Sequence, residues 1–226
     1  MAFAGRGRTA HAHLHAVTDR RRGGGFRYSR EFKDMRDLPL TGSARGLSLA
    51  LLVLLMVATR SQHFADATHL PDASWAVFFL AGILCGGWAA LLGLLALAGT
   101  LDYAAIAHGG ASAFCISPAY TMLVPAYGAL YLGGQLYARW HRARVASLLP
   151  FTACAAAATV TCELLSSGGF YFLSGRFDSP SLAAFGERLL RYFPAVAESM
   201  AFYLLIAVIA YAAFALLREQ RAPAVH

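Results

Sequence analysis

The main shortage in this sequence is charge. Asp, Glu, Lys and Arg together make up 14% of its 226 residues, whereas hydrophobic residues make up 58%. A soluble domain of this size normally has about 25% charged residues, and its core does not need so much apolar sequence. The composition therefore excludes an ordinary soluble domain and indicates an integral membrane protein.

Lysine is nearly absent as well, since Lys33 is the single copy. The chain thus lacks the phosphate-binding motif G-x-x-x-x-G-K-[ST], which excludes an ATPase of that class. It has no C-x-x-C pair of the kind that a membrane thiol oxidoreductase uses. It also has no G-x-S-x-G elbow, the motif of many serine hydrolases. The usual sequence support for these enzyme classes is therefore missing.

Six apolar runs could cross a bilayer as helices: residues 46–60, 73–86, 88–107, 119–138, 146–174 and 185–217. A spanning helix needs about 20 apolar residues, so the first two runs must be extended by their flanks. Gly86-Gly87 favours a turn after the second run, because one merged helix over residues 73–107 would be about 50 Å long. The sequence therefore predicts an all-α integral membrane fold, a bundle of six transmembrane helices.

The placement of arginine predicts the orientation of these helices. If both termini are cytoplasmic, 15 of the 19 Lys and Arg residues fall in inside segments. The outside segments then hold only Arg60, Arg176, Arg188 and Arg191. This is a strong positive-inside bias, so we expect cytoplasmic N and C termini. The net charge of +7 reflects this orientation and does not indicate a nucleic-acid reader, because no folded basic domain exists.

The first 40 residues differ from the rest of the chain. They are rich in Arg, His and Gly and have no apolar periodicity, so we expect a disordered basic tail. The predicted organisation is a tail at residues 1–40, a six-helix membrane domain at 41–219 and a C-terminal tail at 220–226. Met35 is an alternative start that would remove most of the first tail. A signal peptide ending at residues 65–67 is not favoured, because the charged region before the apolar run is too long.

Polar residues gather in the loops that this topology places outside, at residues 60–72, 108–118 and 175–184. They are His63, Asp66, His69, Asp72, Asp102, His108, Cys115 and Tyr120. Asp102 lies deepest, within "LAGTLDYAAIA", and a carboxylate near a membrane span is costly unless it is paired or hydrated. It is therefore a candidate functional residue, with an interfacial cap or a structural hydrogen-bond acceptor as the alternative.

Two further carboxylates, Glu163 and Glu198, lie within the fifth and sixth runs. We expect polar pairing inside the bundle or with cytoplasmic-side arginines, rather than a proton relay. Tyr120, Tyr127 and Tyr131 recur at helical intervals along the fourth run. This spacing favours helix packing or an interfacial belt, and it also permits a pocket wall.

The four cysteines fall into two groups. Cys85, Cys154 and Cys162 lie in apolar runs, where a free cysteine behaves as a small apolar residue, so we expect packing roles. Cys115 lies in the Gly-rich outer loop "HGGASAFCISP", with no second cysteine nearby for a disulfide. An unpaired outer thiol indicates a reactive or metal-ligating role, with a small residue buried under the loop as the alternative.

The number of ligands favours one kind of metal over another. A lone thiolate can be an axial ligand to a metal that a macrocycle already holds, whereas a bare zinc ion needs about four protein ligands. His63 and Asp102 could complete a zinc site with Cys115, but no tight Cys/His spacing supports it. The residue types therefore favour a metal that arrives already chelated.

With these residues together, the chain resembles the BtuM-type solitary substrate-binding (S) components of the energy-coupling-factor (ECF) transporters, which take up vitamin B12 in proteobacteria. The resemblance rests on His63 at the end of the first run, Asp102 in "LDY", and Cys115 and Tyr120 in "CISPAY". It covers roughly residues 36–218.

The resemblance implies a six-helix bundle of the ECF S-component type in the bacterial inner membrane, with a cobalamin pocket on the periplasmic side. Cys115 would ligate the corrin cobalt in place of the vitamin's own nucleotide base, and it would be the reactive residue in removing cyanide from cyanocobalamin. His63, Asp102 and Tyr120 would bind close by. Gly46 and Ala50 would form a docking face for a shared ECF energising module. Cobalamin would be the substrate, and the chain would hold no cofactor of its own.

Three other functions stay open from the sequence. A membrane thiol enzyme that modifies corrinoids without transporting them would use Cys115 equally well. An S component for another vitamin would make Cys115 incidental. A structural membrane protein would bind no ligand.

Overall fold

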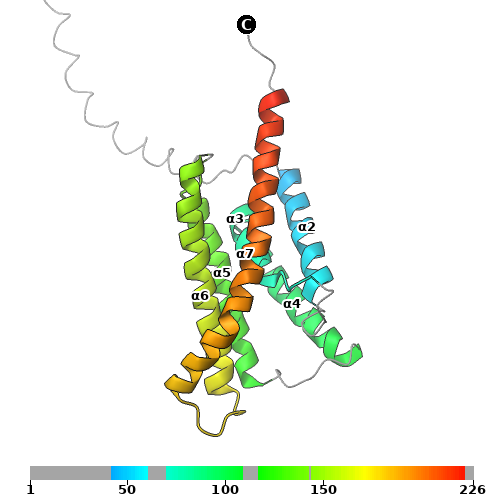
Figure 1. Ribbon diagram of the computed structural model, residues 1–226. Coiled ribbons are helices and arrows are strands. Elements are labelled where there is room, and N and C mark those ends of the chain that lie inside the picture. The colour runs from blue at the N-terminus through cyan, green and yellow to red at the C-terminus, as the bar shows by residue number, and fades with distance from the viewer. Residues whose placement is uncertain (1–41, 61–69, 109–116, 143, 222–226) are drawn as a thin grey trace, which may run out of the picture. The chain divides into compact units, whose positions relative to one another are not determined.

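The computed structural model describes residues 42–60, 70–108, 117–142 and 144–221, and its regular structure is helical (Figure 1). Within these ranges there are six α-helices, two short 3-10 helices and no strand. The α-helices are α2 (Gly42–Arg60), α3 (Ser74–Leu84), α4 (Trp88–His108), α5 (Leu123–Ala138), α6 (Leu148–Leu173) and α7 (Leu182–Arg221). The 3-10 helices are η2 (Pro118–Met122), before α5, and η3 (Val145–Ser147), before α6. The predicted all-α class is confirmed for this part of the chain.

Four of the helices are long and apolar enough to cross a membrane. They are Gly42–Arg60, Trp88–His108, Val145–Leu173 and Leu182–Leu217. Helix α3 is apolar but has only 11 residues. At 1.5 Å per residue it is about 16 Å long, against about 30 Å of hydrocarbon. The described residues therefore support a membrane protein with four candidate spans, and a count of six spans stays a prediction.

Helices α3 and α4 are separated by the turn that Gly86-Gly87 predicts. Gly86 has φ +64°, a left-handed conformation that glycine adopts without a steric penalty. The hydroxyl of Tyr131 donates to the carbonyl of Gly87 at 2.7 Å, and Nε2 of Gln135 donates to the carbonyl of Gly86 at 2.8 Å. Side chains of α5 thus bind both carbonyl groups of this turn, and the Gly87 carbonyl also accepts a hydrogen bond from the backbone N–H of Ala90 at 3.1 Å.

The closest helix contact joins α3 to α5. The fully buried side chains of α3 include Val77, Phe78 and Phe79. A Cβ atom added at Gly82 would overlap the carbonyl oxygen of Tyr131, and one added at Gly134 would overlap that of Phe79. Small residues permit this close approach of two backbones in membrane bundles. Gly82 therefore lies at the helix contact, whereas Gly86 lies in the turn beyond the helix.

Helix α6 packs against α5 through small side chains. A Cβ atom at Gly133 of α5 would overlap that of Ala158 of α6. Cys154 and Cys162 lie in α6 and are 7% and 0% exposed. Both thiols are therefore part of the packed interior, as predicted, and neither lies in the outer loops.

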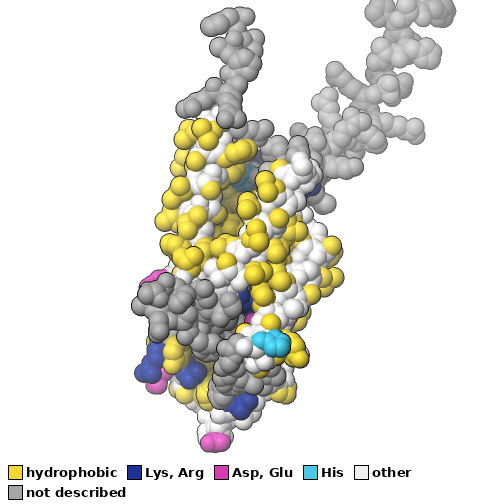
Figure 2. All heavy atoms as spheres, turned by 90° about the vertical axis from the view of Figure 1, so that its right-hand side faces the viewer, with side chains coloured by type: hydrophobic (Ala, Val, Ile, Leu, Met, Phe, Trp, Pro, Cys, Tyr) yellow, Lys and Arg dark blue, Asp and Glu magenta, His cyan; other side chains and the backbone are white. Residues whose placement is uncertain are grey.

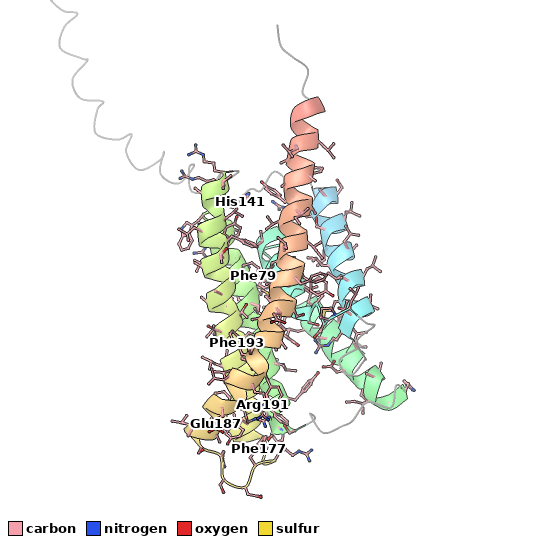
Figure 3. The ribbon with its side chains drawn as sticks, viewed as in Figure 1. Phe79, His141, Phe177, Glu187, Arg191 and Phe193 are labelled. Atoms are coloured by element: carbon pink, nitrogen blue, oxygen red, sulfur yellow. The ribbon has the colours of Figure 1, made fainter. Side chains whose placement is uncertain are left out.

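Helix α7 has 40 residues and contains Pro194. A straight helix of this length would measure about 60 Å, twice the thickness of the hydrocarbon core at about 30 Å. Figure 1 shows that the axis of α7 bends in its lower, orange part, and Phe193, beside the proline, lies there in Figure 3. Proline removes a helical hydrogen bond and crowds the preceding turn, which accounts for the bend.

The outward faces of the helices are apolar. Leu47, Leu51 and Leu54 follow one face of α2 and are all more than half exposed. Figure 2 shows hydrophobic side chains over much of the upper part of the face in view, with charged side chains toward the lower end. Buried polar side chains, among them Arg60 and Glu163, lie inside. An apolar outer surface, with only a few buried polar side chains inside a mainly apolar core, is a distribution that a lipid environment favours.

Candidate functional site

A buried ion pair joins α2 to α4. Arg60 is the last residue of α2, and Asp102 lies within α4. Nε of Arg60 donates to Oδ1 of Asp102 and Nη2 donates to Oδ2, each at 2.7 Å. Two parallel N–H···O bonds give an arginine and a carboxylate both strength and a defined orientation. The pair is also shielded from solvent on the arginine side, because only 2% of the Arg60 side chain is exposed.

The remaining nitrogen of Arg60 binds two other helices. Nη1 donates to Oγ of Ser74 and to the hydroxyl oxygen of Tyr127, each at 2.9 Å. Ser74 begins α3, and Tyr127 lies in α5. The guanidinium carbon is also 5.5 Å from the centroid of the Tyr127 ring, within the range of a cation–π contact. One guanidinium therefore connects α2, α3, α4 and α5.

Tyr120 completes this group of side chains. It lies in η2, and its hydroxyl donates to Oδ2 of Asp102 at 2.7 Å. We call the group the Arg60 cluster, which comprises Arg60, Ser74, Asp102, Tyr120 and Tyr127. Ser117 lies just before η2, and its Oγ atom is buried without a hydrogen-bond partner among the residues described. A buried hydroxyl without a partner is unusual in a folded protein and is available to a polar ligand.

Helix α7 supports the cluster through the segment before α3. Ser199 donates its hydroxyl to the carbonyl of Asp72 at 2.8 Å, and Tyr203 donates to the carbonyl of Pro71. Oδ1 of Asp72 accepts hydrogen bonds from the backbone N–H and the hydroxyl of Ser74, at 2.9 and 2.6 Å. Ser74 is thus held from both sides, by Asp72 and by the Arg60 guanidinium.

The structure brings together two of the four predicted site residues. Asp102 and Tyr120 come from α4 and η2 and share a hydrogen bond. His63 and Cys115 lie outside the described residues, as do Asp66 and His69. The predicted roles of His63 and Cys115 therefore stay predictions.

The role of Arg60 was missed at the level of sequence. There this arginine counted only as a charge of an outside segment at the end of the first run, whereas the side chain is 3% exposed and ion-paired. The sequence did contain a signal, because an arginine at the end of one apolar run and an aspartate within another each need a partner. The two are 42 positions apart, so no local pattern connects them.

The two carboxylates of the long helices have different surroundings. Glu163 is 3% exposed, and its Oε1 accepts a hydrogen bond from Oγ of Ser167 at 2.6 Å. Polar pairing was predicted for Glu163, and the observed partner is a serine one turn further along α6 rather than an arginine. Glu198 is exposed on α7 and forms no hydrogen bond or ion pair within the described ranges.

A second polar contact lies at the other end of α5. The hydroxyl of Tyr137 is 2.7 Å from Nδ1 of His141, and Nε2 of His141 is 3.1 Å from the hydroxyl of Tyr211 in α7. His141, labelled in Figure 3, lies in the connection that follows α5. Burial lowers the pKa of His141. A neutral imidazole can accept at one nitrogen and donate at the other, which fits the two flanking hydroxyls.

An arginine near the start of α7 lies among aromatic rings. The guanidinium carbon of Arg188 lies 5.8 Å from the ring centroid of Tyr171, 5.0 Å from that of Phe177 and 5.4 Å from that of Tyr192. Figure 3 shows Phe177 at the lower end of the molecule. Rings from α6, from the connection and from α7 thus pack around one cation.

The structure provides two further observations on possible ligand sites. Across the described segments, no group of three or more His, Cys, Asp or Glu side chains could hold a metal ion. A shallow groove of about 370 Å³ lies on α5 and α6 and is lined by small or apolar residues, including Ala129, Leu136 and Ala157. It has no charged side chain and contains no member of the Arg60 cluster, so we treat it as a helix-packing surface.

Comparison of the chain with protein-family models found no match, and comparison with curated proteins found none. These comparisons therefore assign no family to the chain.

Proposed function

We propose that this protein is the substrate-binding component of a vitamin B12 transporter of the ECF type in the bacterial inner membrane. It binds cobalamin on the periplasmic side, and both of its termini are cytoplasmic. The observation that carries the proposal is the 2.7 Å hydrogen bond between Tyr120 and Asp102, two of the four residues on which the resemblance rests. They are 18 positions apart and belong to different helices, so proximity in the sequence does not account for their contact.

The other two residues are attached to the Arg60 cluster by short lengths of chain. His63 follows Arg60 by three residues, which reach at most about 11 Å when extended. Cys115 precedes Tyr120 by five residues, which reach at most about 18 Å. These limits permit all four residues to approach one bulky ligand.

The proposed chemistry centres on Cys115. Its sulfur binds the cobalt of the corrinoid, and the nucleotide base of the vitamin is displaced. Coordination to a metal deprotonates a thiol that is otherwise mostly neutral near pH 7. A thiolate donor to cobalt also favours release of cyanide from cyanocobalamin, which is the second part of the proposal.

Absorbance of the purified protein in the corrin region tests the ligand and the role of Cys115 together. Wild type should bind cobalamin with a spectrum that differs from that of the free vitamin, and Cys115→Ala should lose the sulfur–cobalt signature. Cys85→Ala is the matched control. Cys85 is a half-buried cysteine at the C-terminal end of α3, whereas Ser74 of the Arg60 cluster is at the N-terminal end of that helix. The ligand assignment is wrong if Cys115→Ala and wild type have the same spectrum.

Uptake measurements separate transport from the alternatives. In cells that lack other B12 importers, the protein should restore cobalamin uptake. Modified corrinoids without uptake would favour the membrane thiol enzyme. Competition with several vitamins tests an S component of different specificity, which would be indifferent to cobalamin. Binding of no vitamin at all would favour a structural membrane protein.

The exposed face of α2 supports docking of an ECF energising module. Gly46 and Ala50 are both exposed, and a Cβ atom at Gly46 would meet no atom within 4 Å. Gly46→Leu should therefore leave cobalamin binding intact and reduce uptake, because it removes the small residue that a partner helix needs. Gly93→Leu, at an equally open and exposed position on α4, is the control. Equal uptake by the two variants would contradict this docking face.

A further inference from the structure

The carboxylate of Asp102 has little hydrogen-bonding capacity left. A carboxylate offers about four lone-pair positions. Arg60 Nε occupies one position on Oδ1, while Arg60 Nη2 and the Tyr120 hydroxyl occupy two on Oδ2. Within the described part of the chain, the position left open is therefore on Oδ1.

The two members of the ion pair differ in accessibility. The Asp102 side chain is 22% exposed, whereas that of Arg60 is 2% exposed. Nη1 of Arg60 is already directed at Ser74 and Tyr127. A ligand can therefore reach the carboxylate, but the guanidinium is not available to bind an anion.

The charge of the pair decides which ligand group suits this position. An isolated carboxylate would attract a cation such as an ammonium group. Here a positive guanidinium nitrogen lies 2.7 Å from Asp102, so the pair is neutral and its attraction for a ligand cation is largely cancelled. Asp72 is another carboxylate of this region, and its Oδ1 accepts two hydrogen bonds from Ser74. The open position on Asp102 therefore suits a neutral N–H donor.

We propose that Arg60 is a positioning residue that makes Asp102 a fixed, charge-neutralised acceptor for a carboxamide N–H group of the ligand. This inference rests on the proposed function, because the peripheral side chains of the cobalamin corrin ring include carboxamides. Arg60 acts through Asp102 and does not touch the ligand. Tyr120 holds the same carboxylate through Oδ2, so the acceptor is oriented by two residues.

Cobalamin derivatives that are altered at one peripheral carboxamide test this inference. In one series the carboxamide is hydrolysed to an anionic carboxylic acid, and in the other it is extended to a cationic aminoethyl amide. At one ring position, wild type should bind cobalamin at least about tenfold more tightly than the acid, because a hydrogen bond to a charged group is lost. The cationic derivative at that position should bind no more tightly than cobalamin.

Substitution of Arg60 should change this preference for charge. In Arg60→Gln the ratio of the affinity for the cationic derivative to the affinity for cobalamin should rise at least about tenfold. The reason is that Asp102 then carries an uncompensated charge. Arg60→Lys keeps the positive charge and should retain the wild-type preference. Arg188→Gln is the control, since Arg188 has aromatic contacts near the α6–α7 connection, and it should leave the preference unchanged.

The outcomes distinguish this inference from the proposed function. If wild type binds no corrinoid, both are wrong. Two results would show that only the inference is wrong. Wild type could bind the cationic derivative more tightly than cobalamin, or it could bind the acid derivative of every ring position as tightly as cobalamin. An equal loss of affinity for all derivatives in Arg60→Gln would also overturn it, because a purely structural role predicts that result. If Arg60→Gln does not fold, the wild-type series and Arg60→Lys decide.

Discussion

At the residue scale, the most consequential feature is a buried arginine that donates four hydrogen bonds. Burying a guanidinium costs several kcal/mol unless a partner of good geometry compensates. Asp102 accepts two hydrogen bonds from Arg60, and Ser74 and Tyr127 accept two more. Loss of one charged partner should therefore harm the protein more than replacement of both by apolar residues.

Asp102→Ala should lower the free energy of unfolding by about 3 kcal/mol, because it leaves the Arg60 charge buried without its partner. The double variant Arg60→Met/Asp102→Leu should be less destabilised than Asp102→Ala alone. Thermal unfolding in detergent measures both effects. Asp178→Ala is the control, since Asp178 is an exposed carboxylate whose loss should change stability by less than about 0.5 kcal/mol. This account would be contradicted if the double variant lost as much free energy of unfolding as Arg60→Met and Asp102→Leu lose when their single effects are added.

His141 should make stability depend on pH. Burial lowers its pKa in the folded protein, whereas the unfolded chain has the ordinary value of about 6.5. The unfolded chain therefore binds a proton first as the pH falls, so stability present at neutral pH is lost below about pH 6.5. His141→Gln should lose less stability on acidification than wild type, as measured by unfolding temperature across pH. His108→Gln, at an exposed histidine that ends α4, should behave as wild type does. If the unfolding temperature of His141→Gln fell on acidification as much as that of wild type, His141 would not be the group responsible.

At the element scale, the arrangement of the helices depends on where backbones can approach each other. Gly82 of α3 and Gly134 of α5 each lie against a carbonyl group of the opposite helix. This contact places α3 so that Ser74 at its start meets Arg60, and Tyr127 of α5 meets the same guanidinium. The α3–α5 contact therefore determines the geometry of the Arg60 cluster.

Gly82→Ala should destabilise the protein by about 1–3 kcal/mol or more, because the new methyl group overlaps a backbone atom that cannot move independently. Gly93→Ala is the matched control at an open position of α4, and its higher helix propensity should stabilise the protein by up to about 1 kcal/mol. Unfolding in detergent compares the two. Similar stability of both variants would show that the α3–α5 backbones are farther apart than described.

At the scale of the whole molecule, the described helices have an apolar outer surface and a mainly apolar core, and the Arg60 cluster is a polar group inside that core. This distribution explains why the charged fraction of 14% suffices, since few charged residues are needed where lipid covers the surface. The orientation of the chain in the membrane follows from arginine placement and stays a prediction.

Labelling of single-cysteine variants tests this orientation. A membrane-impermeant maleimide applied to intact spheroplasts should label a variant that retains only Cys115 and should not label one that retains only Cys85. The reason is that the two ends of α3 lie at different levels of the bundle. Ser74 begins the helix and belongs to the Arg60 cluster, whereas Cys85 follows its other end. Permeabilised spheroplasts are the control for thiol access. The reverse labelling pattern would contradict cytoplasmic termini.

Features that depend on neighbouring residues could be predicted from the sequence. Apolar runs anticipated the six α-helices of the described residues to within a few residues, and Gly86-Gly87 anticipated the turn after α3. Asp102 was identified as a functional candidate because a carboxylate in an apolar run needs a partner. These predictions rest on composition over a few helical turns, and tertiary contacts do not alter that information.

The sequence by itself thus determined the class of the protein, the positions of its helices and two members of the cluster, Asp102 and Tyr120. Only the tertiary structure decided that Arg60 is the partner of Asp102 and that Ser74 and Tyr127 complete the cluster. The physical reason is that charge pairing between distant segments depends on which helix faces meet. For Ser74 and Tyr127 that choice is made by close backbone packing between α3 and α5, which no local pattern of residues encodes.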